Sequence, residues 1–226
     1  MLSRRARVLA ATLHQHCTEI SGADLTLWVN IIDLMPRPGA IKGVEERAVG
    51  MQVQLFGSIT VTVADRSVAL TGDYPRAILG RLALSAGETI PADQLISDIW
   101  DVPPESALST LRAHISRMRA LLPRATLIGD RTGYVLRADP ASIDVWQFRN
   151  GLRELGEARS SADYLSRLQE LTCLSANDFL IGLERHPFVL PARSALNEAR
   201  RTAQEDLGEG RLEVGDNMLA IATLTD

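Results

Sequence analysis

The most regular hydrophobic pattern in the chain lies between Pro104 and Leu122. Apolar residues recur there at alternating steps of three and four, which places them on one stripe of an α-helix. At roughly 100° per residue, this stripe contains Leu108, Leu111, Ile115, Met118 and Leu122, and the opposite side contains Ser106, Ser109, Thr110, Ala113, Ser116 and Arg117. The pattern therefore predicts an amphipathic helix whose outer side is small, hydroxyl-bearing and basic.

The basic residues of this predicted helix have no acidic neighbours. Arg112, Arg117 and Arg119 lack an acid three or four positions away, and Glu105 lies at the helix start, where the helix dipole favours it. Small side chains allow close approach to a DNA major groove, and arginine can reach phosphate or the edge of guanine. The helix alone leaves two interpretations open, DNA recognition and an ordinary amphipathic helix with a solvated face.

A different pattern, alternation with a period of two, begins at Met51 and predicts a small antiparallel sheet. Apolar and polar residues alternate over 51–55 and again over 59–63. Such alternation with β-branched residues is typical of strands that have one face in water. Asp65–Ser67 is predicted as a turn, followed by a short third strand over 68–70.

The order of the next elements indicates a winged helix-turn-helix. A helix is predicted from about Asp73 to Gly87, and a second one over Pro91–Trp100, with Trp100 in the core. The helix over 104–122 is third, and a β-hairpin over 126–136 follows it. Glycines bracket the hairpin loop, which carries Arg131 and Thr132 at its tip. In this architecture the third helix enters the major groove and the hairpin reaches the neighbouring backbone or minor groove.

The rest of the chain is predicted to be helical from residue 143 onward. Apolar spacing predicts helices over 143–155 and 162–171, a long helix that ends near Gly208 or Gly210, and a partial helix over 212–224. Helix pairs of this length suggest a repeat-type bundle. Residues 1–50 contain no motif. We interpret them as an N-terminal extension, either a flexible arm or sequence upstream of a true start at Met51.

Composition and charge narrow the functional classes. Of 226 residues, 46% are hydrophobic and 23% charged, which is ordinary for a soluble globular protein. The net charge of -4 hides a basic patch, because residues 104–137 contain 6 Arg against two acids, Glu105 and Asp130. Cys17 and Cys173 match no disulfide or zinc spacing, so we predict a reduced, cytoplasmic compartment. We expect no membrane span, because no apolar run approaches the roughly 20 residues required.

Catalysis is not expected from this sequence. It contains none of the motifs that mark phosphate-binding loops, serine hydrolases or zinc proteases, and no cluster of metal ligands. We therefore predict a protein that is not an enzyme, with no catalytic residue, no metal site and no cofactor.

Several stretches together resemble the SARP family, actinobacterial activators of antibiotic gene clusters. They are LFGSITV (55–61), RAILGRLAL (76–84), DQLISDIW (93–100), TLRAHISRMRALL (110–122), GYVL (133–136) and IDVWQF (143–148). The resemblance implies an α+β fold, an OmpR-like winged helix-turn-helix over 51–138, followed by an all-α, TPR-like bacterial transcriptional activation domain over 143–226. Asp73-Tyr74-Pro75-Arg76 departs from the basic P-K-Q-R of the family, and the helical domain is shorter, which indicates a C-terminally truncated member.

The resemblance also implies which residues contact DNA. Base-edge contacts are expected from Thr110, Ala113 and Arg117, phosphate contacts from His114, Ser116 and Arg119, and wing contacts from Arg131 and Thr132. The helical wheel places Arg117 on the outer face independently. Alternatives stay open for two of them: His114 could be a half-buried packing residue, and Arg119 could pair with acids of the helical domain.

The function that the resemblance implies is sequence-specific activation of a biosynthetic gene cluster. The expected partners are double-stranded DNA, as direct repeats upstream of promoters, and RNA polymerase, and a homodimer on DNA is compatible with this. Two alternatives remain. One is a truncated regulator that binds DNA without activating, and the other is a helical protein-interaction module that does not bind DNA.

Overall fold

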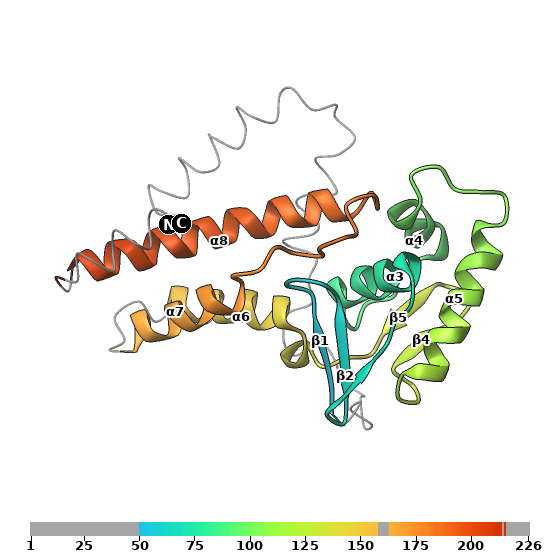
Figure 1. The fold of residues 1–226 in the computed structure, drawn as a ribbon, viewed down its shortest axis with the longest axis horizontal. Helices are drawn as coiled ribbons and strands as arrows, with labels where there is room; N and C mark the ends of the chain where they lie inside the picture. Colours follow the sequence, from blue (N-terminus) through green and yellow to red (C-terminus); the bar gives the residue numbers. More distant parts are fainter. Residues whose placement is uncertain (1–49, 158–162, 214, 216–226) are drawn as a thin grey trace. The chain divides into compact units, whose positions relative to one another are not determined.

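The computed structural model describes residues 50–157, 163–213 and 215 (Figure 1). The predicted extension over 1–50 therefore lies outside the described residues except for Gly50, as does most of the partial helix predicted over 212–224. The elements, in chain order, are β1 (Met51–Gln54), β2 (Thr60–Val63), β3 (Arg66–Val68), α3 (Asp73–Leu84), α4 (Ala92–Ile99), α5 (Ala107–Leu121), β4 (Leu127–Gly129), β5 (Tyr134–Leu136), η2 (Pro140–Ser142), α6 (Asp144–Glu157), α7 (Tyr164–Leu174) and α8 (Val189–Glu213).

This order confirms the predicted fold, an α+β winged helix-turn-helix followed by an all-α region. Strands β1, β2 and β3 form an antiparallel sheet, and β4 and β5 form a separate hairpin. In β1, Met51 and Val53 are buried while Gln52 and Gln54 are exposed, so the sheet has the one wet face that the alternation predicts.

The third strand was predicted two residues too late in the chain. The register pairs Val63 with Arg66, so the two-residue turn is Ala64–Asp65, and β3 begins at Arg66 instead of residue 68. Both turn residues have positive φ, 48° for Ala64 and 60° for Asp65, as a type I′ turn requires. Since neither is glycine or asparagine, the sequence lacks the usual signal for this turn.

Three helices pack around the first core. The inward residues Leu111, Ile115 and Met118 of α5 are at most 1% exposed, which confirms the predicted stripe. Leu108 was predicted in the same stripe but is 37% exposed. It lies in the first turn of α5, which begins at Ala107 and not at Pro104, and in that turn Ala107 is the residue that reaches the core. Trp100 is 7% exposed, as expected for a core residue.

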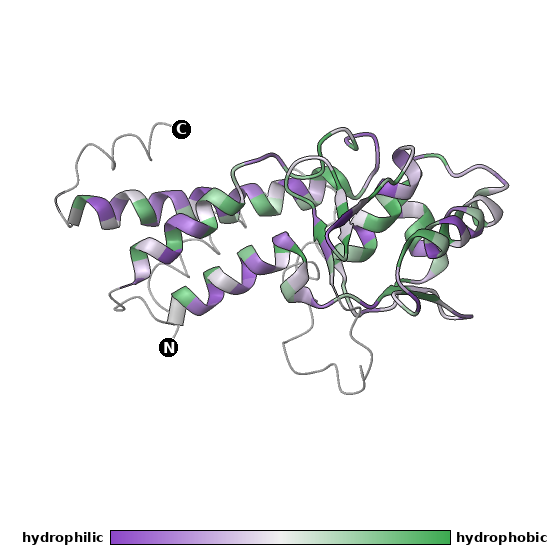
Figure 2. Ribbon diagram, turned by 60° about the horizontal axis from the view of Figure 1, so that its bottom comes forward, coloured by the Kyte–Doolittle hydropathy of each residue, from purple (hydrophilic) through white to green (hydrophobic). Residues whose placement is uncertain are grey.

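The helices of the second half approach one another closely at glycines. Helix α7 packs against both α6 and α8. A Cβ at Gly151 would lie 2.6 Å from the side chain of Leu171, and one at Gly210 would lie 2.3 Å from that of Leu165. Gly208 and Gly210 were predicted to end the long helix, but α8 continues through both. Figure 2 shows hydrophobic and hydrophilic residues alternating along α8, as in a helix that is covered on one side.

The helices α6, α7 and α8, here named the helical region, share their core with the winged helix. The indole Nε1 of Trp146, in α6, donates to the carbonyl of Ala83 in α3 at 2.9 Å. Phe56 contacts Phe148 and Phe179 edge to face, with ring centroids 5.7 and 6.3 Å apart. The carboxylate of Asp144 accepts from three backbone N–H groups, two of them at the end of β1. The helical region therefore completes the hydrophobic core of the winged helix.

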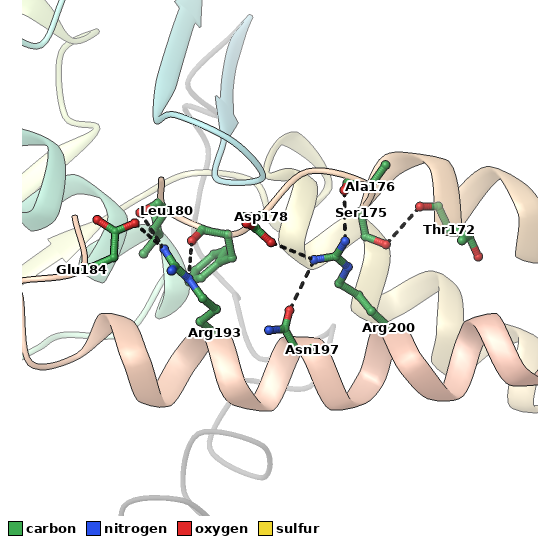
Figure 3. Close-up of polar contacts among 10 residues, drawn as sticks. Thr172, Ser175, Ala176, Asp178, Leu180, Glu184, Arg193, Asn197 and Arg200 are labelled. Carbon is green, nitrogen blue, oxygen red and sulfur yellow. Dashed lines mark hydrogen bonds and ion pairs between the residues drawn. The ribbon is translucent and has the colours of Figure 1, made fainter. Parts of the chain in front are cut away.

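Residues 175–188, here named the α7–α8 connection, join α7 to α8 and pack against the winged helix. The N–H of Leu180 donates to the Leu55 carbonyl at 2.9 Å, and that of Gly57 donates to the Asp178 carbonyl at 2.6 Å. Two arginines of α8 hold the connection from its other side (Figure 3). Arg193 donates to the carbonyl groups of residues 179 and 180 at 3.0 and 3.3 Å, and Arg200 donates to that of residue 176 at 3.0 Å. The connection is therefore fixed both to the segment between β1 and β2 and to α8.

Candidate nucleic-acid interface

The outer face of α5 is the first part of the candidate site. Ala113, Ser116 and Arg117 are exposed, as is Ser109 one turn earlier, while Thr110 is half-buried at the edge of this face. Helix α5 contains no acidic residue. The face is therefore flat, hydroxyl-rich and basic, because its long side chains are arginines and the others end within a few atoms of the backbone.

The arginines around this face are not neutralised by neighbouring acids. Some arginines elsewhere are paired, as Arg81 is with Asp98 at 2.6 Å and Arg193 with Glu184 at 3.0 Å. Within the described part of the chain, no ion pair or hydrogen bond involves the exposed side chains of Arg112, Arg117, Arg124 and Arg131. Their donors are available to an anionic partner, and a polyphosphate backbone is the partner that arginine fits best.

The hairpin β4–β5 is the second part of the site. Its loop is held by Asp130, whose Oδ1 accepts from the N–H of Thr132 at 2.7 Å and from its hydroxyl at 2.5 Å. The Thr132 hydroxyl and N–H bonds also hold the pKa of Asp130 below its usual value. Because Thr132 donates to Asp130, the exposed Arg131 is the tip residue whose donors are uncommitted. A Cβ at Gly133 would lie 2.1 Å from the Ile90 carbonyl oxygen, so this position requires glycine.

Arg119 fixes the hairpin against the helix. Its Nε donates to the Leu127 carbonyl in β4 at 2.9 Å. Of the two open interpretations for Arg119, pairing with acids of the helical region does not occur within the described residues. The phosphate contact of Arg119, which its Nη groups would make, remains a prediction. The bond places the six predicted α5 residues and the two predicted hairpin residues on adjoining elements.

His114 occupies the edge of the face nearest α3. It is half-buried, its ring stacks on that of Tyr74 with centroids 5.9 Å apart, and its Nδ1 is buried with no hydrogen-bond partner. Burial lowers the pKa of His114, and the nearby Arg117 lowers it further. The geometry thus supports the packing interpretation of His114, while its phosphate contact stays a prediction.

Sequence reasoning noted Arg112 as an unpaired arginine but did not place it among the contacts, and it omitted Arg124 and one aromatic residue from the site. Arg112 and Arg124 are exposed and unpaired beside the predicted contacts, and the charge of Arg124 alone could have marked it. Tyr74 supports His114 from α3, and no local pattern connects residues so far apart in the chain.

The described residues offer no sign of a metal centre. Within them, no three His, Cys, Asp or Glu side chains lie close enough together to hold a metal ion. Likewise, the helices found in the described ranges are all too short or too polar to cross a membrane.

We expect acid to destabilise the fold through His186. This ring is 1% exposed, and its Nδ1 lies 2.8 Å from the Ile99 carbonyl, so the neutral ring donates there. Burial lowers the pKa of His186. The hydrogen bond to Ile99 and the charge of Asp73 raise this pKa, and the charge of Arg185 lowers it further, so that it stays below its usual value. The unfolded chain therefore takes up the proton first as the pH falls below 6.5. The stabilising contribution is complete above pH 6.5 and is lost as the pH falls through the folded pKa.

This dependence can be measured as the change in Tm between about pH 7.5 and 5.5, a range that brackets the usual histidine pKa. The Tm of the wild type should fall more over this range than that of His186→Gln, whatever the Tm of the variant at neutral pH. Burial also raises the pKa of Asp144, but the effect of Asp144 on Tm is the same in both proteins and cancels in the comparison. Equal falls would show that His186 titrates alike in the folded and unfolded states.

Comparison with known proteins identifies relatives of this arrangement. Residues 65–136 match the family model described as "Transcriptional regulatory protein, C terminal". The regulatory protein AfsR of Streptomyces griseus is 31% identical over 159 residues, which covers 66% of this chain and 16% of AfsR. AfsR of Streptomyces coelicolor is 26% identical over 194 residues, 84% of this chain and 19% of that protein. The regulatory protein DnrI of Streptomyces peucetius is 28% identical over 183 residues, 73% of this chain and 66% of DnrI.

A solved structure shows the same fold. That of Mycobacterium tuberculosis EmbR, in complex with a low affinity phosphopeptide, superposes with a TM-score of 0.68 at 23% identity, covering 76% of this chain and 48% of EmbR. The chain thus spans less than a fifth of either AfsR protein and about two thirds of DnrI. These findings confirm the resemblance predicted from residues 55–148.

Proposed function

We propose that this chain, as a member of the SARP regulators, is a sequence-specific DNA-binding protein that activates transcription of a biosynthetic gene cluster. The observation that carries the proposal is the acid-free outer face of α5, adjoined by a hairpin with an uncommitted arginine at its tip. In a winged helix, α5 would lie in the major groove, and the hairpin would reach the flanking backbone. Arg117 would bind a base edge, and Arg119 and Arg131 would bind phosphates.

Activation would use parts of the protein surface that do not contact DNA. The turn between α4 and α5, residues 101–106, is exposed, and Val102 within it is 82% exposed. Every residue of this turn is therefore accessible to a protein partner. We therefore propose that this turn and the helical region contact RNA polymerase, with the chain bound to direct repeats upstream of a promoter.

Selection from random DNA tests the proposed function. The full chain would be incubated with a random-sequence duplex library in excess competitor DNA, and the bound fraction sequenced. We expect enrichment of a motif that occurs twice in the same orientation. Transcription in vitro from a promoter that carries this motif would then separate activation from binding alone. Absence of enrichment with folded protein would instead favour a protein-interaction module.

Arg131→Ala should weaken binding to every DNA sequence by a similar factor. Because a phosphate contact carries no sequence information, the loss should be uniform, and the slope of log Kd against log salt should flatten by about one unit. Fluorescence anisotropy on the selected site and on a scrambled site, over a salt series, measures both quantities. Arg153→Ala, which removes the same charge from an exposed position of α6, serves as the control. An unchanged slope would remove Arg131 from the predicted contacts.

A further inference from the structure

The ring of Tyr74 links α5 to the helical region. Tyr74 lies in the first turn of α3, where it stacks on Trp100 with centroids 5.1 Å apart and on His114 of α5 at 5.9 Å. Since the buried Nδ1 of His114 makes no hydrogen bond, stacking on Tyr74 is the contact that fixes this side of the ring. The side chain of His114, at the midpoint of α5, therefore packs directly on Tyr74.

The α7–α8 connection holds the same tyrosine from its other side. The ring of His186 meets that of Tyr74 edge to face at 5.6 Å, and the guanidinium of Arg185 lies 4.9 Å from the Tyr74 centroid. Arg185 also pairs with Asp73, the neighbour of Tyr74, at 3.1 Å. Two consecutive residues of the connection thus contact the first turn of α3.

The connection is in turn fixed at both of its ends. At its C-terminal end, His186 bonds the Ile99 carbonyl, and the N–H of Phe188 donates to the Asp98 carbonyl at 3.3 Å. Upstream, Arg193 of α8 bonds the carbonyl groups of residues 179 and 180 and the carboxylate of Glu184, as Figure 3 shows. A continuous series of contacts therefore runs from α8 through Arg193 and the connection to Arg185 and His186, and from them to Tyr74.

We propose that Tyr74 is a positioning residue through which the α7–α8 connection sets the orientation of α5, so that the state of the helical region and the affinity for DNA are coupled. The proposal rests on the proposed function, because the coupling is expressed as DNA affinity. Coupling between two sites is reciprocal. DNA bound at α5 must then stabilise the connection, although the connection contains none of the predicted DNA contacts.

Two substitutions with matched partners test the positioning role. Tyr74→Leu removes the ring but keeps an apolar side chain, and Tyr74→Phe restores the ring. Arg185→Gln acts from the helical side, and Arg201→Gln is its control, because both arginines pair with acids and both side chains are 55% exposed. Each variant would be measured for Kd on the DNA site selected by the wild type. Amide hydrogen exchange of α5 and the connection would be followed with and without that DNA.

The coupling predicts a specific set of results. Tyr74→Leu should weaken specific binding about fivefold or more, and Tyr74→Phe should retain wild-type affinity. Arg185→Gln should weaken it about two- to fivefold relative to Arg201→Gln, the range of a cation–π contact. DNA should slow exchange in the connection of the wild type, and Tyr74→Leu should abolish that protection while the variant remains folded.

Other results would overturn the proposal. If Arg185→Gln and Arg201→Gln bind alike and α5 exchanges alike in both, the connection does not position α5. If Tyr74→Leu keeps DNA-dependent protection in the connection, the coupling does not pass through the ring. Should the wild type select no DNA site, the proposed function fails. Exchange of α5 in Arg185→Gln against Arg201→Gln, measured without DNA, still decides whether the connection controls the helix.

Discussion

Arg117→Ala should cost about 1–3 kcal/mol of binding free energy on the selected site, roughly 5- to 150-fold in Kd. The physical reason is its place at the centre of the exposed face of α5, flanked by Ala113 and Ser116, whose short side chains allow the helix to approach the base edges. Within the described residues the guanidinium has no acidic partner, so binding DNA would not require an internal ion pair to break. A bidentate contact to guanine uses two parallel N–H donors, which alanine cannot supply.

The decisive feature of this prediction is its dependence on sequence. Anisotropy titrations would compare four versions of the selected site, the original and the three that differ from it at the base pair that Arg117 contacts. Arg117→Ala should bind all four alike at the position that Arg117 contacts, whereas the wild type should prefer one of them. Arg153→Ala, with the same loss of charge in α6, should keep the full preference. A loss that is equal on all sites would show that Arg117 contacts phosphate rather than a base.

The elements that local pattern determines were predictable from the sequence. Helix α5 follows from the spacing of Leu111, Ile115 and Met118, and the hairpin β4–β5 pairs 127–129 with 134–136 as its two apolar runs indicate. These features depend on residues a few positions apart, so periodicity and turn chemistry are sufficient. The exposed face of α5 follows from the same periodicity, as the opposite side of the helix.

The features that escaped prediction depend on contacts between distant residues. His186 bonds a carbonyl 87 positions away, and Asp144 bonds an N–H 89 positions away. Neither leaves a pattern in its own neighbourhood. The prediction that the long helix ends near Gly210 was wrong for the same reason. Glycine by itself favours the end of a helix, but Gly210 packs closely on Leu165 within α8. The type I′ turn at Ala64–Asp65 forms against the preference of Ala64, because the register of the two strands requires positive φ there.

Asp144→Ala should lower the free energy of unfolding by about 2–4 kcal/mol, because buried N–H groups lose their acceptor. The carboxylate is 7% exposed and lies 2.9 Å from the N–H of Leu55, 3.0 Å from that of Phe56 and 2.7 Å from that of Val145. Burial raises the pKa of Asp144, although these N–H groups lower it, so an appreciable desolvation cost opposes the bonds. The expected loss is therefore smaller than the sum of three charged hydrogen bonds.

Urea denaturation with linear extrapolation measures this loss. Asp139→Ala is the matched control, because Asp139 is exposed, accepts from the N–H of Ala141 at 3.0 Å, and carries the same charge a few residues earlier. Its loss should be about 0.5–1 kcal/mol, typical of an exposed helix cap. Asp144→Asn, which keeps one acceptor oxygen, should fall between the two. If Asp144→Ala costs no more than the control, the ends of β1 and α6 are held by apolar packing around Phe56 and Trp146, and the carboxylate adds nothing to it.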